Sequence, residues 1–223
     1  MNKLLIVTCR QAKTDKEFEQ KPIFQSFKKQ YEINSSIEPY IFKDNKRGLS
    51  ECYNEILKEP KHLDKTVLFV HDDVELEDNR MVNKLVNSPY DVTGLAGAKT
   101  FDKRAPKLAW HLASSKQDYV GEVAHCYQEK VWTTVFGPTN SRSLTLDGLF
   151  LAVKPNILNQ KGLTFDEDFQ FHFYDIAFCL RANQHKVSCG VLPIRAIHHG
   201  IGDSMLTSEW QNANSLFREK YCL

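Results

Sequence analysis

The sequence predicts a mixed α/β fold, in which a mostly parallel central sheet is flanked by helices. In the first half, short apolar runs alternate with amphipathic segments, and this order of strands and helices is typical of a parallel, doubly wound sheet. In the second half, short alternating runs predict a small antiparallel segment. No repeat, low-complexity tract or linker separates the halves, so we expect a single domain over residues 1–223.

The first half is expected to contain three strands and two helices. In chain order, these are a strand at 3–8, a helix at 15–31, a strand at 37–42, a helix at 48–59 and a strand at 66–70. The strands are rich in branched apolar residues, which is the composition of strands buried on both faces. The first helix has apolar residues at three- and four-residue spacings, and Pro22 interrupts it or starts it afresh.

The second half is expected to contain further strands and two further helices. We expect strands at 92–99, within 119–135, at 144–153, at 186–192 and at 194–199, and helices at 173–184 and 208–221. A polar loop with Trp110 and His111 follows the first of these strands. The last helix has mixed charge, which favours packing against the domain over insertion into a membrane.

Composition excludes several classes of protein. The chain has 29 basic and 28 acidic residues, a formal charge of +1, which argues against a surface that coats nucleic acid. No stretch approaches the ~18 apolar residues of a membrane span, so we expect a cytoplasmic protein with at most peripheral membrane contact. The six cysteines form no CxxC or CxH pair, and buried free thiols are favoured over disulfides or zinc.

Charged residues follow two of the predicted parallel strands directly. Arg10 follows the first strand, and Asp72 and Asp73 follow the strand at 66–70. Ligands of such sheets bind beyond the carboxyl ends of the strands, so these side chains are expected on one rim. Adjacent carboxylates need a compensating cation, and Mg²⁺ or Mn²⁺ prefers oxygen ligands. The alternative is a solvated acidic turn.

Two further candidates lie near the C-terminus. Asp175 is early in a predicted helix, where the helix dipole stabilises an ionised carboxylate that can act as a general base or only as an N-terminal cap. His198 and His199 follow a predicted strand, and an imidazole can complete a metal shell or serve a structural role.

The order of these motifs resembles the family 2-like glycosyltransferases of the GT-A fold. The motifs are Asn45-Lys46-Arg47-Gly48-Leu49-Ser50 with Asn54, Phe69-Val70-His71-Asp72-Asp73-Val74, Asp147-Gly148, Phe165-Asp166-Glu167, Tyr174-Asp175 with Arg181, and His199. The sequence is most similar to the branch named after a streptomycin biosynthesis protein, in which HDDV stands at the DxD position. The resemblance covers roughly residues 3–203.

The resemblance implies a GT-A (Rossmann-like) domain that transfers a sugar from a nucleotide-diphosphate donor, with UDP-sugars favoured. Asp73 and His199 would bind Mn²⁺ or Mg²⁺, and Asp175 would be the base of an inverting reaction. The donor-binding residues would be Thr8, Cys9, Arg10, Asn54, Asp72, Asp147 and Gly148. The nucleotide-binding half would span about 1–100, the acceptor-side half about 101–205, and a C-terminal helix about 207–221.

The acceptor implied is a glycan, a glycolipid or a glycoprotein, and Trp110, Trp132 and Phe150 are candidates for an aromatic groove that holds it, or else packing residues. Tyr174 replaces the glutamate of the usual Glu-Asp pair, and Ala177 stands where a further acidic residue is expected. A non-catalytic nucleotide-sugar or glycan-binding module is therefore the main alternative. A two-metal phosphoryl hydrolase would need more carboxylates near the first pair.

Overall fold

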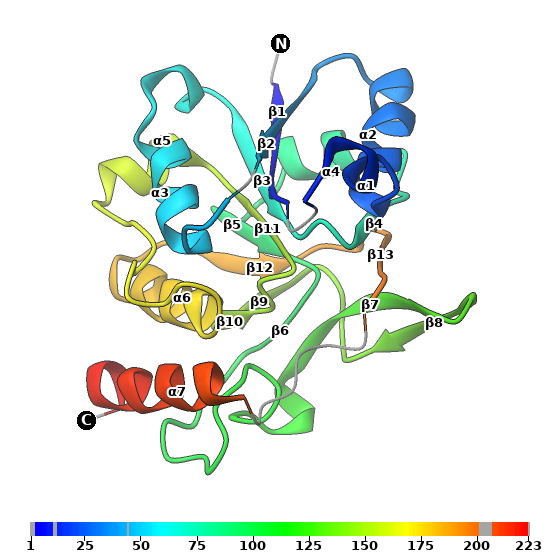
Figure 1. The fold of residues 1–223 in the computed structure, drawn as a ribbon. Helices are drawn as coiled ribbons and strands as arrows, with labels where there is room; N and C mark the ends of the chain where they lie inside the picture. Colours follow the sequence, from blue (N-terminus) through cyan, green and yellow to red (C-terminus); the bar gives the residue numbers. More distant parts are fainter. Residues whose placement is uncertain (1–2, 11–12, 44, 201–206, 223) are drawn as a thin grey trace.

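A seven-stranded sheet forms the centre of the molecule. The computed structural model describes residues 3–10, 13–43, 45–200 and 207–222. The strand order is β2 (Ile37–Phe42), β1 (Leu4–Cys9), β3 (Thr66–Val70), β11 (Phe150–Val153), β5 (Val92–Gly94), β12 (Cys189–Val191) and β9 (Ser141–Ser143) (Figure 1). The pairings make β2, β1, β3, β5 and β12 run in one direction and β11 and β9 in the other. The predicted class, a mostly parallel sheet in a mixed α/β fold, is confirmed.

A second, smaller sheet lies beside the first. Its strands follow the order β10 (Thr145–Leu146), β6 (Ala96–Ala98), β7 (Tyr119–Tyr127), β13 (Ala196–His198) and β4 (Val74–Leu76), with β8 (Lys130–Val135) paired to β7. The long β7–β8 hairpin is antiparallel and projects from the body of the molecule (Figure 1). This sheet contains the predicted antiparallel segment.

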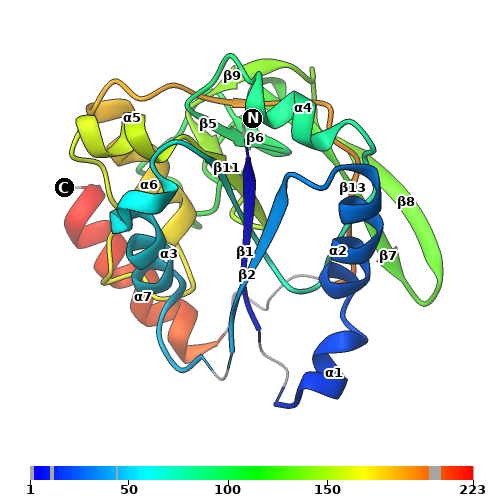
Figure 2. The same cartoon turned by 90° about the horizontal axis from the view of Figure 1, so that it is seen from above.

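Helices cover both faces of the main sheet (Figure 2). On one side lie α3 (Leu49–Lys58), α5 (Pro155–Gln160), α6 (Tyr174–Gln184) and α7 (Ser208–Tyr221); on the other lie α1 (Asp15–Glu19), α2 (Pro22–Ile33) and α4 (Met81–Val86). Short 3₁₀ turns occur at Pro60–His62 and Lys116–Asp118. Successive side chains of a strand point to opposite faces, so Leu5 and Val7 enter one hydrophobic core while Leu4 and Ile6 enter the other. This explains why the strand is apolar throughout.

Three predicted elements are divided in the structure. The helix expected at 15–31 is two helices, because Pro22 takes the first position of α2, where a fixed φ and a missing N–H are tolerated. The strand expected at 92–99 becomes β5 and β6, which belong to different sheets, and the strand expected at 144–153 becomes β10 and β11 in the same way. Within each of these two stretches, the chain crosses from one sheet to the other. The two crossings are tied together by a hydrogen bond from the Asp147 amide to the Ala96 carbonyl (2.9 Å).

The C-terminal helix α7 packs on the main core. Phe217 is fully buried and stacks on Phe173, with ring centroids 5.2 Å apart. Lys220 pairs with Asp166 at 3.0 Å, and the hydroxyl of Tyr221 donates to the same carboxylate at 2.7 Å. The helix expected at 208–221 is confirmed in these bounds. None of the described helices is both long and apolar enough to cross a membrane.

The six cysteines are free, as predicted. Cys52, Cys179 and Cys189 are buried, whereas Cys9, Cys126 and Cys222 are partly exposed.

Candidate functional site

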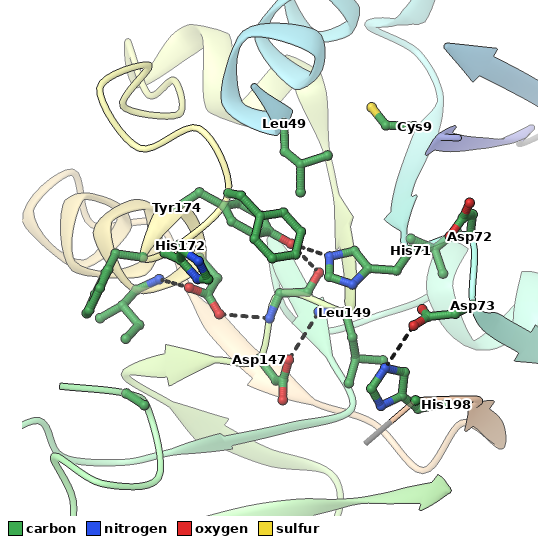
Figure 3. A pocket seen from close by; sticks show the side chains of 18 of the residues that line it. Cys9, Leu49, His71, Asp72, Asp73, Asp147, Leu149, His172, Tyr174 and His198 are labelled. Carbon is green, nitrogen blue, oxygen red and sulfur yellow. Dashed lines mark hydrogen bonds and ion pairs between the residues drawn. The ribbon is translucent and has the colours of Figure 1, made fainter. Parts of the chain in front are cut away.

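A cavity of about 1260 Å³ opens at the carboxyl ends of β1, β2 and β3. Its walls include Cys9 at the end of β1, Arg10 after it, residues 45–48 after β2 and residues 71–73 after β3. Figure 3 shows Cys9 and the side chains of 71–73 in this wall. Because β11 runs antiparallel to β3, the segment 147–149 before it reaches the same edge. The beginning of α6, at 174–176, completes this part of the wall. The topology therefore brings five separate segments to one site.

Seven of the ten predicted site residues line this cavity, and three do not. Those that line it are Cys9, Arg10, Asp72, Asp73, Asp147, Gly148 and Asp175. The other three are Thr8, Asn54 and His199. Thr8 is fully buried within β1, which holds its side chain away from the cavity wall.

Asn54 holds two segments of the fold together. Its Nδ2 donates to the Phe165 carbonyl at 3.0 Å and to Glu167 Oε1 at 2.8 Å, and its Oδ1 accepts from the Phe165 amide at 2.8 Å. The side chain is buried, and these contacts use both its donor and its acceptor. Asn54 therefore ties α3 to the segment before α6, and the structure gives no support to a donor-binding role.

Asp73 contacts His198, and His199 lies elsewhere. Nε2 of His198 is 3.2 Å from Asp73 Oδ2 (Figure 3). Nε2 of His199 is 3.0 Å from Glu75 Oε2, and only the backbone amide of His199 reaches Asp73, at its carbonyl (2.8 Å). His199 was the histidine expected beside Asp73, but the structure places His198 there, because successive residues of an extended segment point in opposite directions.

The two adjacent aspartates have different surroundings. Asp72 is almost fully buried, and its Oδ2 lies 3.6 Å from the ammonium of Lys21 at the start of α2. Asp73 is less buried, and its Oδ1 has no hydrogen-bond partner among the described residues. Burial raises the pKa of Asp73, but the hydrogen bond and charge of His198 outweigh burial and leave this pKa below its ordinary value. Asp73 is thus an ionised carboxylate with one oxygen still available.

Asp175 is held by two backbone amides near the beginning of α6. Its Oδ2 accepts from the Gly148 amide at 2.9 Å and its Oδ1 from the Ile176 amide at 2.8 Å. The helix position leads us to expect a stabilised, ionised carboxylate. Burial, together with the charge of Asp147, instead raises the pKa of Asp175 to about 7. A carboxyl group with this pKa can gain or lose a proton near neutral pH, which suits acid–base chemistry.

A buried network of His71, Tyr174 and Gly148 supports Asp175. The Tyr174 hydroxyl donates to the Gly148 carbonyl at 2.7 Å and lies 3.0 Å from His71 Nε2 (Figure 3). A Cβ on Gly148 would lie 2.4 Å from this hydroxyl, so only glycine fits there. Burial lowers the pKa of His71 and keeps the imidazole neutral. This role of Tyr174 is not predicted from the sequence. The only sign of it in the sequence is that tyrosine stands in place of the glutamate of the usual Glu-Asp pair.

Asp147 joins the loop around residue 110 to the turn before β11. Its Oδ2 accepts from the indole N–H of Trp110 at 3.0 Å, and its Oδ1 accepts from the Leu149 amide at 3.1 Å. Trp110 lines the cavity but is nearly buried. Of the other two aromatic candidates, Trp132 lines the cavity and is exposed, whereas Phe150 is fully buried in the core. Phe150 therefore serves packing.

Charges are segregated along the cavity. The basic residues that line it are Arg10, Lys13, Lys46 and Arg47, which all follow β1 or β2. The carboxylates that line it follow β3, precede β11 or begin α6. Arg10 is nearly buried, forms an ion pair with Asp15 and lies over the ring of Phe18. One end of the cavity thus suits anionic groups, and the other suits a cation or an acid–base step.

Cys9 lies between these regions and carries a neutral thiol. The hydrogen bond with the neighbouring Cys52, followed by burial, raises the pKa of Cys9 far above its ordinary value. A nucleophilic thiolate is therefore disfavoured at this position.

Within the described ranges, no group of three or more histidine, cysteine, aspartate or glutamate side chains is arranged to hold a metal ion. A cation bound between Asp73 and His198 would therefore need ligands beyond these two side chains.

A protein-family model described as "Glycosyltransferase like family" matches residues 29–221. The chain belongs to this family. The matched range contains the carboxylates of the cavity and the histidine beside Asp73, as well as α7. The family description agrees with the glycosyltransferase-like class expected from the sequence, and the mixed α/β fold is the class expected from the GT-A resemblance.

The fold of this glycosyltransferase-like chain is similar to those of many solved structures, two of which are described here. One is TarS 1-349 of S. aureus in complex with UDP, with 14% identity, a TM-score of 0.48 and coverage of 89% of this chain and 60% of the other. The other is the mannosyltransferase PcManGT of Pyrobaculum calidifontis in complex with GDP-Man and Mn²⁺, with 11% identity, a TM-score of 0.46 and coverage of 88% and 56%. This chain spans less than two thirds of either protein. No curated protein matches the sequence.

Proposed function

We propose that the protein transfers a sugar from a nucleotide-diphosphate donor to a hydroxyl group of a glycan, glycolipid or glycoprotein, with inversion at the anomeric carbon. The observation that carries this proposal is the segregated charge of the cavity, in which basic residues line one end and Asp73, Asp147 and Asp175 line the other. A nucleoside diphosphate needs cationic partners, and sugar transfer needs a base beyond the diphosphate.

We place the nucleotide at the end lined by Arg10, Lys13, Lys46 and Arg47. Beyond the carboxyl ends of parallel strands is where α/β sheets bind nucleotides, and these residues follow β1 and β2. We favour a UDP-sugar as donor. Asp72, which is held by Lys21, would stand on the ribose or sugar side of Asp73.

A divalent cation, Mn²⁺ or Mg²⁺, fits the residues at the other end of the nucleotide. Asp73 has a buried oxygen without a hydrogen-bond partner among the described residues, and His198 beside it offers an imidazole nitrogen. Carboxylate and imidazole suit Mn²⁺, and such ions commonly take their remaining ligands from substrate phosphates. When bound, the cation supplies charge stabilisation for the departing diphosphate. This arrangement supports the proposal that His71-Asp72-Asp73-Val74 stands at the DxD position, as in the streptomycin biosynthesis protein-like branch.

Asp175 is the proposed base. The amides of Gly148 and Ile176 orient its carboxylate, and an ionised carboxylate can accept the proton of the attacking hydroxyl. Ala177 is fully buried in the core and does not line the cavity. An alanine at this position therefore does not remove a carboxylate from the site. This favours a working enzyme over the non-catalytic module.

The test is a screen of UDP-, GDP- and CMP-sugars with Mn²⁺, read as heat stabilisation and as release of free nucleotide. Asp73→Asn is expected to weaken metal-dependent binding by at least about tenfold. Asp175→Asn is expected to retain binding and to lower turnover by about 10²–10⁴-fold. Glu75→Gln is the matched control, since this carboxylate lies two residues from Asp73 but outside the cavity. Binding without turnover against a broad acceptor set would favour the module, and equal turnover in wild type and Asp175→Asn would remove Asp175 as the base.

A further inference from the structure

We propose that the β7–β8 hairpin carries a binding site for a sugar ring of the acceptor, with Trp132 as its stacking platform. This inference rests on the proposed function and specifies the acceptor as a saccharide that presents one face of a pyranose ring. The residues of the site are His125 on β7 and Trp132 and Thr134 on β8, which all line the cavity.

The register of the hairpin turns one of its faces to the cavity. His125 is paired directly with Trp132 and Val123 with Thr134, and all four line the cavity. Val131 and Val135 alternate with these residues on β8, do not line the cavity and are exposed. Successive side chains of a strand point to opposite faces, so one face of β8 lines the cavity and the other is exposed to solvent.

Trp132 has the geometry of a stacking platform. The rings of His125 and Trp132 are stacked, with centroids 5.5 Å apart and an angle of 26° between their planes. His125 therefore supports the indole ring. Among the described residues, no other ring stacks on Trp132, and 47% of the residue is exposed. The face of an aromatic ring is electronegative, whereas the C–H groups on one face of a pyranose are weakly electropositive, so the two attract each other. The hydroxyl of Thr134, on the same face, can bond a sugar hydroxyl.

A continuous series of contacts joins this platform to the proposed reaction centre. The ring of His125 lies 6.1 Å from that of His198, and His198 contacts Asp73 at 3.2 Å. The basic residues that we assign to the nucleotide follow β1 and β2 in the other sheet. With the nucleotide at that end, the hairpin is placed to hold the second substrate. The platform is therefore assigned to the acceptor.

Saturation-transfer NMR on the full chain tests this assignment. The probes are the methyl α- and β-glycosides of glucose, galactose and N-acetylglucosamine, each measured without nucleotide and again with UDP and Mn²⁺. We expect transfer to the ring protons of at least one glycoside in the wild type. Trp132→Ala should weaken its binding by about tenfold, and Trp132→Phe should restore most of the affinity. Val135→Ala, on the opposite face of the same strand, should match the wild type.

Nucleotide binding, measured in parallel as heat stabilisation by UDP with Mn²⁺, separates this inference from the proposed function. Unchanged nucleotide binding in Trp132→Ala, together with weaker glycoside binding, supports the acceptor site. Equal glycoside binding in wild type and Trp132→Ala, or no transfer to any glycoside in the wild type, overturns it. An equal loss of nucleotide binding also overturns it, because the platform would then belong to the donor. If the wild type binds glycosides through Trp132 but binds no nucleotide sugar, the saccharide site is supported and the proposed function is contradicted.

Discussion

The hydroxyl of Tyr174 lies 3.0 Å from Nε2 of His71 and donates to the carbonyl of Gly148 at 2.7 Å. These contacts join the end of β3, where the two aspartates lie, to the turn whose amide holds Asp175 (Figure 3). Tyr174, which stands where the family resemblance leads us to expect a glutamate, therefore has a structural role. It positions the turn at Gly148 beside the proposed base, Asp175.

Tyr174→Phe tests this positioning role. Loss of the hydroxyl leaves the Gly148 carbonyl and His71 without their partner, which should cost about 1–3 kcal/mol of unfolding free energy. It should also lower kcat by about tenfold with little change in the KM for the donor, because Gly148 no longer fixes the carboxylate of Asp175. Tyr221→Phe is the control, since it removes a similar hydrogen bond to Asp166 outside the cavity. An equal fall of kcat in both variants would contradict the positioning role.

The pH dependence of turnover should reflect Asp175. A base must be ionised, and burial raises the pKa of this group to about 7, so the ionised fraction falls as the pH drops through that value. We expect kcat to fall by about tenfold for each unit below pH 7 and to level off above it. A profile measured between about pH 5.5 and 8.5 checks this. A rate that stays level down to about pH 5.5 would contradict the assignment.

Adjacent histidines allow a matched test of the metal proposal. His198→Ala should lower the affinity for Mn²⁺ in the presence of UDP by about ten- to a hundredfold, because it removes the imidazole beside Asp73. His199→Ala removes only a contact with Glu75 and should leave this affinity unchanged. Isothermal titration of both variants with Mn²⁺ measures the difference. A loss confined to His199→Ala would restore the prediction made from the sequence.

Gly148→Ala should disrupt the site through packing alone. The added Cβ would lie 2.4 Å from the hydroxyl of Tyr174 and 3.0 Å from the Cβ of Asp175, and such overpacking costs about 1–3 kcal/mol. We expect a lower melting temperature together with the loss of turnover. Gly162→Ala also destabilises, since Gly162 has φ +63°, but it has open space around it and lies away from the cavity. Its folded fraction should therefore keep full turnover.

Phe217→Ala should show how strongly α7 is bound to the core. The ring is fully buried against Phe169, Phe173 and Tyr221, and its removal should cost about 3–5 kcal/mol of unfolding free energy. Ser215→Ala, on the exposed face of the same helix, should change stability by less than about 0.5 kcal/mol. Denaturant unfolding measures both. A small effect of Phe217→Ala would mean that α7 contributes little to the fold.

The sequence predicted the edge at which the site lies better than it predicted individual contacts. The alternation of strands and helices fixes which strand ends share an edge, and Arg10, Asp72 and Asp73 follow from that rule. The choice between His198 and His199 depends on the register of β13, and a shift of one residue reverses every side chain. Sequence patterns do not fix this register.

Buried partners explain the other differences. Asn54 has the polar amide expected of a ligand-binding residue, but its partners are over a hundred positions away in the chain and become neighbours only when α3 packs on the segment before α6. Phe150 has the aromatic ring expected of a groove, but it lies on a strand that is buried on both faces. Tyr174 was noticed only as a departure from a pattern, because its function depends on a backbone carbonyl that no pattern reveals.

Two of the places where the chain passes between the sheets lie at residue 95 and at residues 147–149, and the second of these lines the cavity. Both crossings are backbone segments, and the bond from Asp147 to Ala96 fixes their separation. The part of the cavity wall at residues 147–149 is therefore held in place when the protein folds. The conformational entropy of ordering this segment is lost during folding, so binding does not have to supply it again, and affinity depends on the contacts that a ligand makes with it.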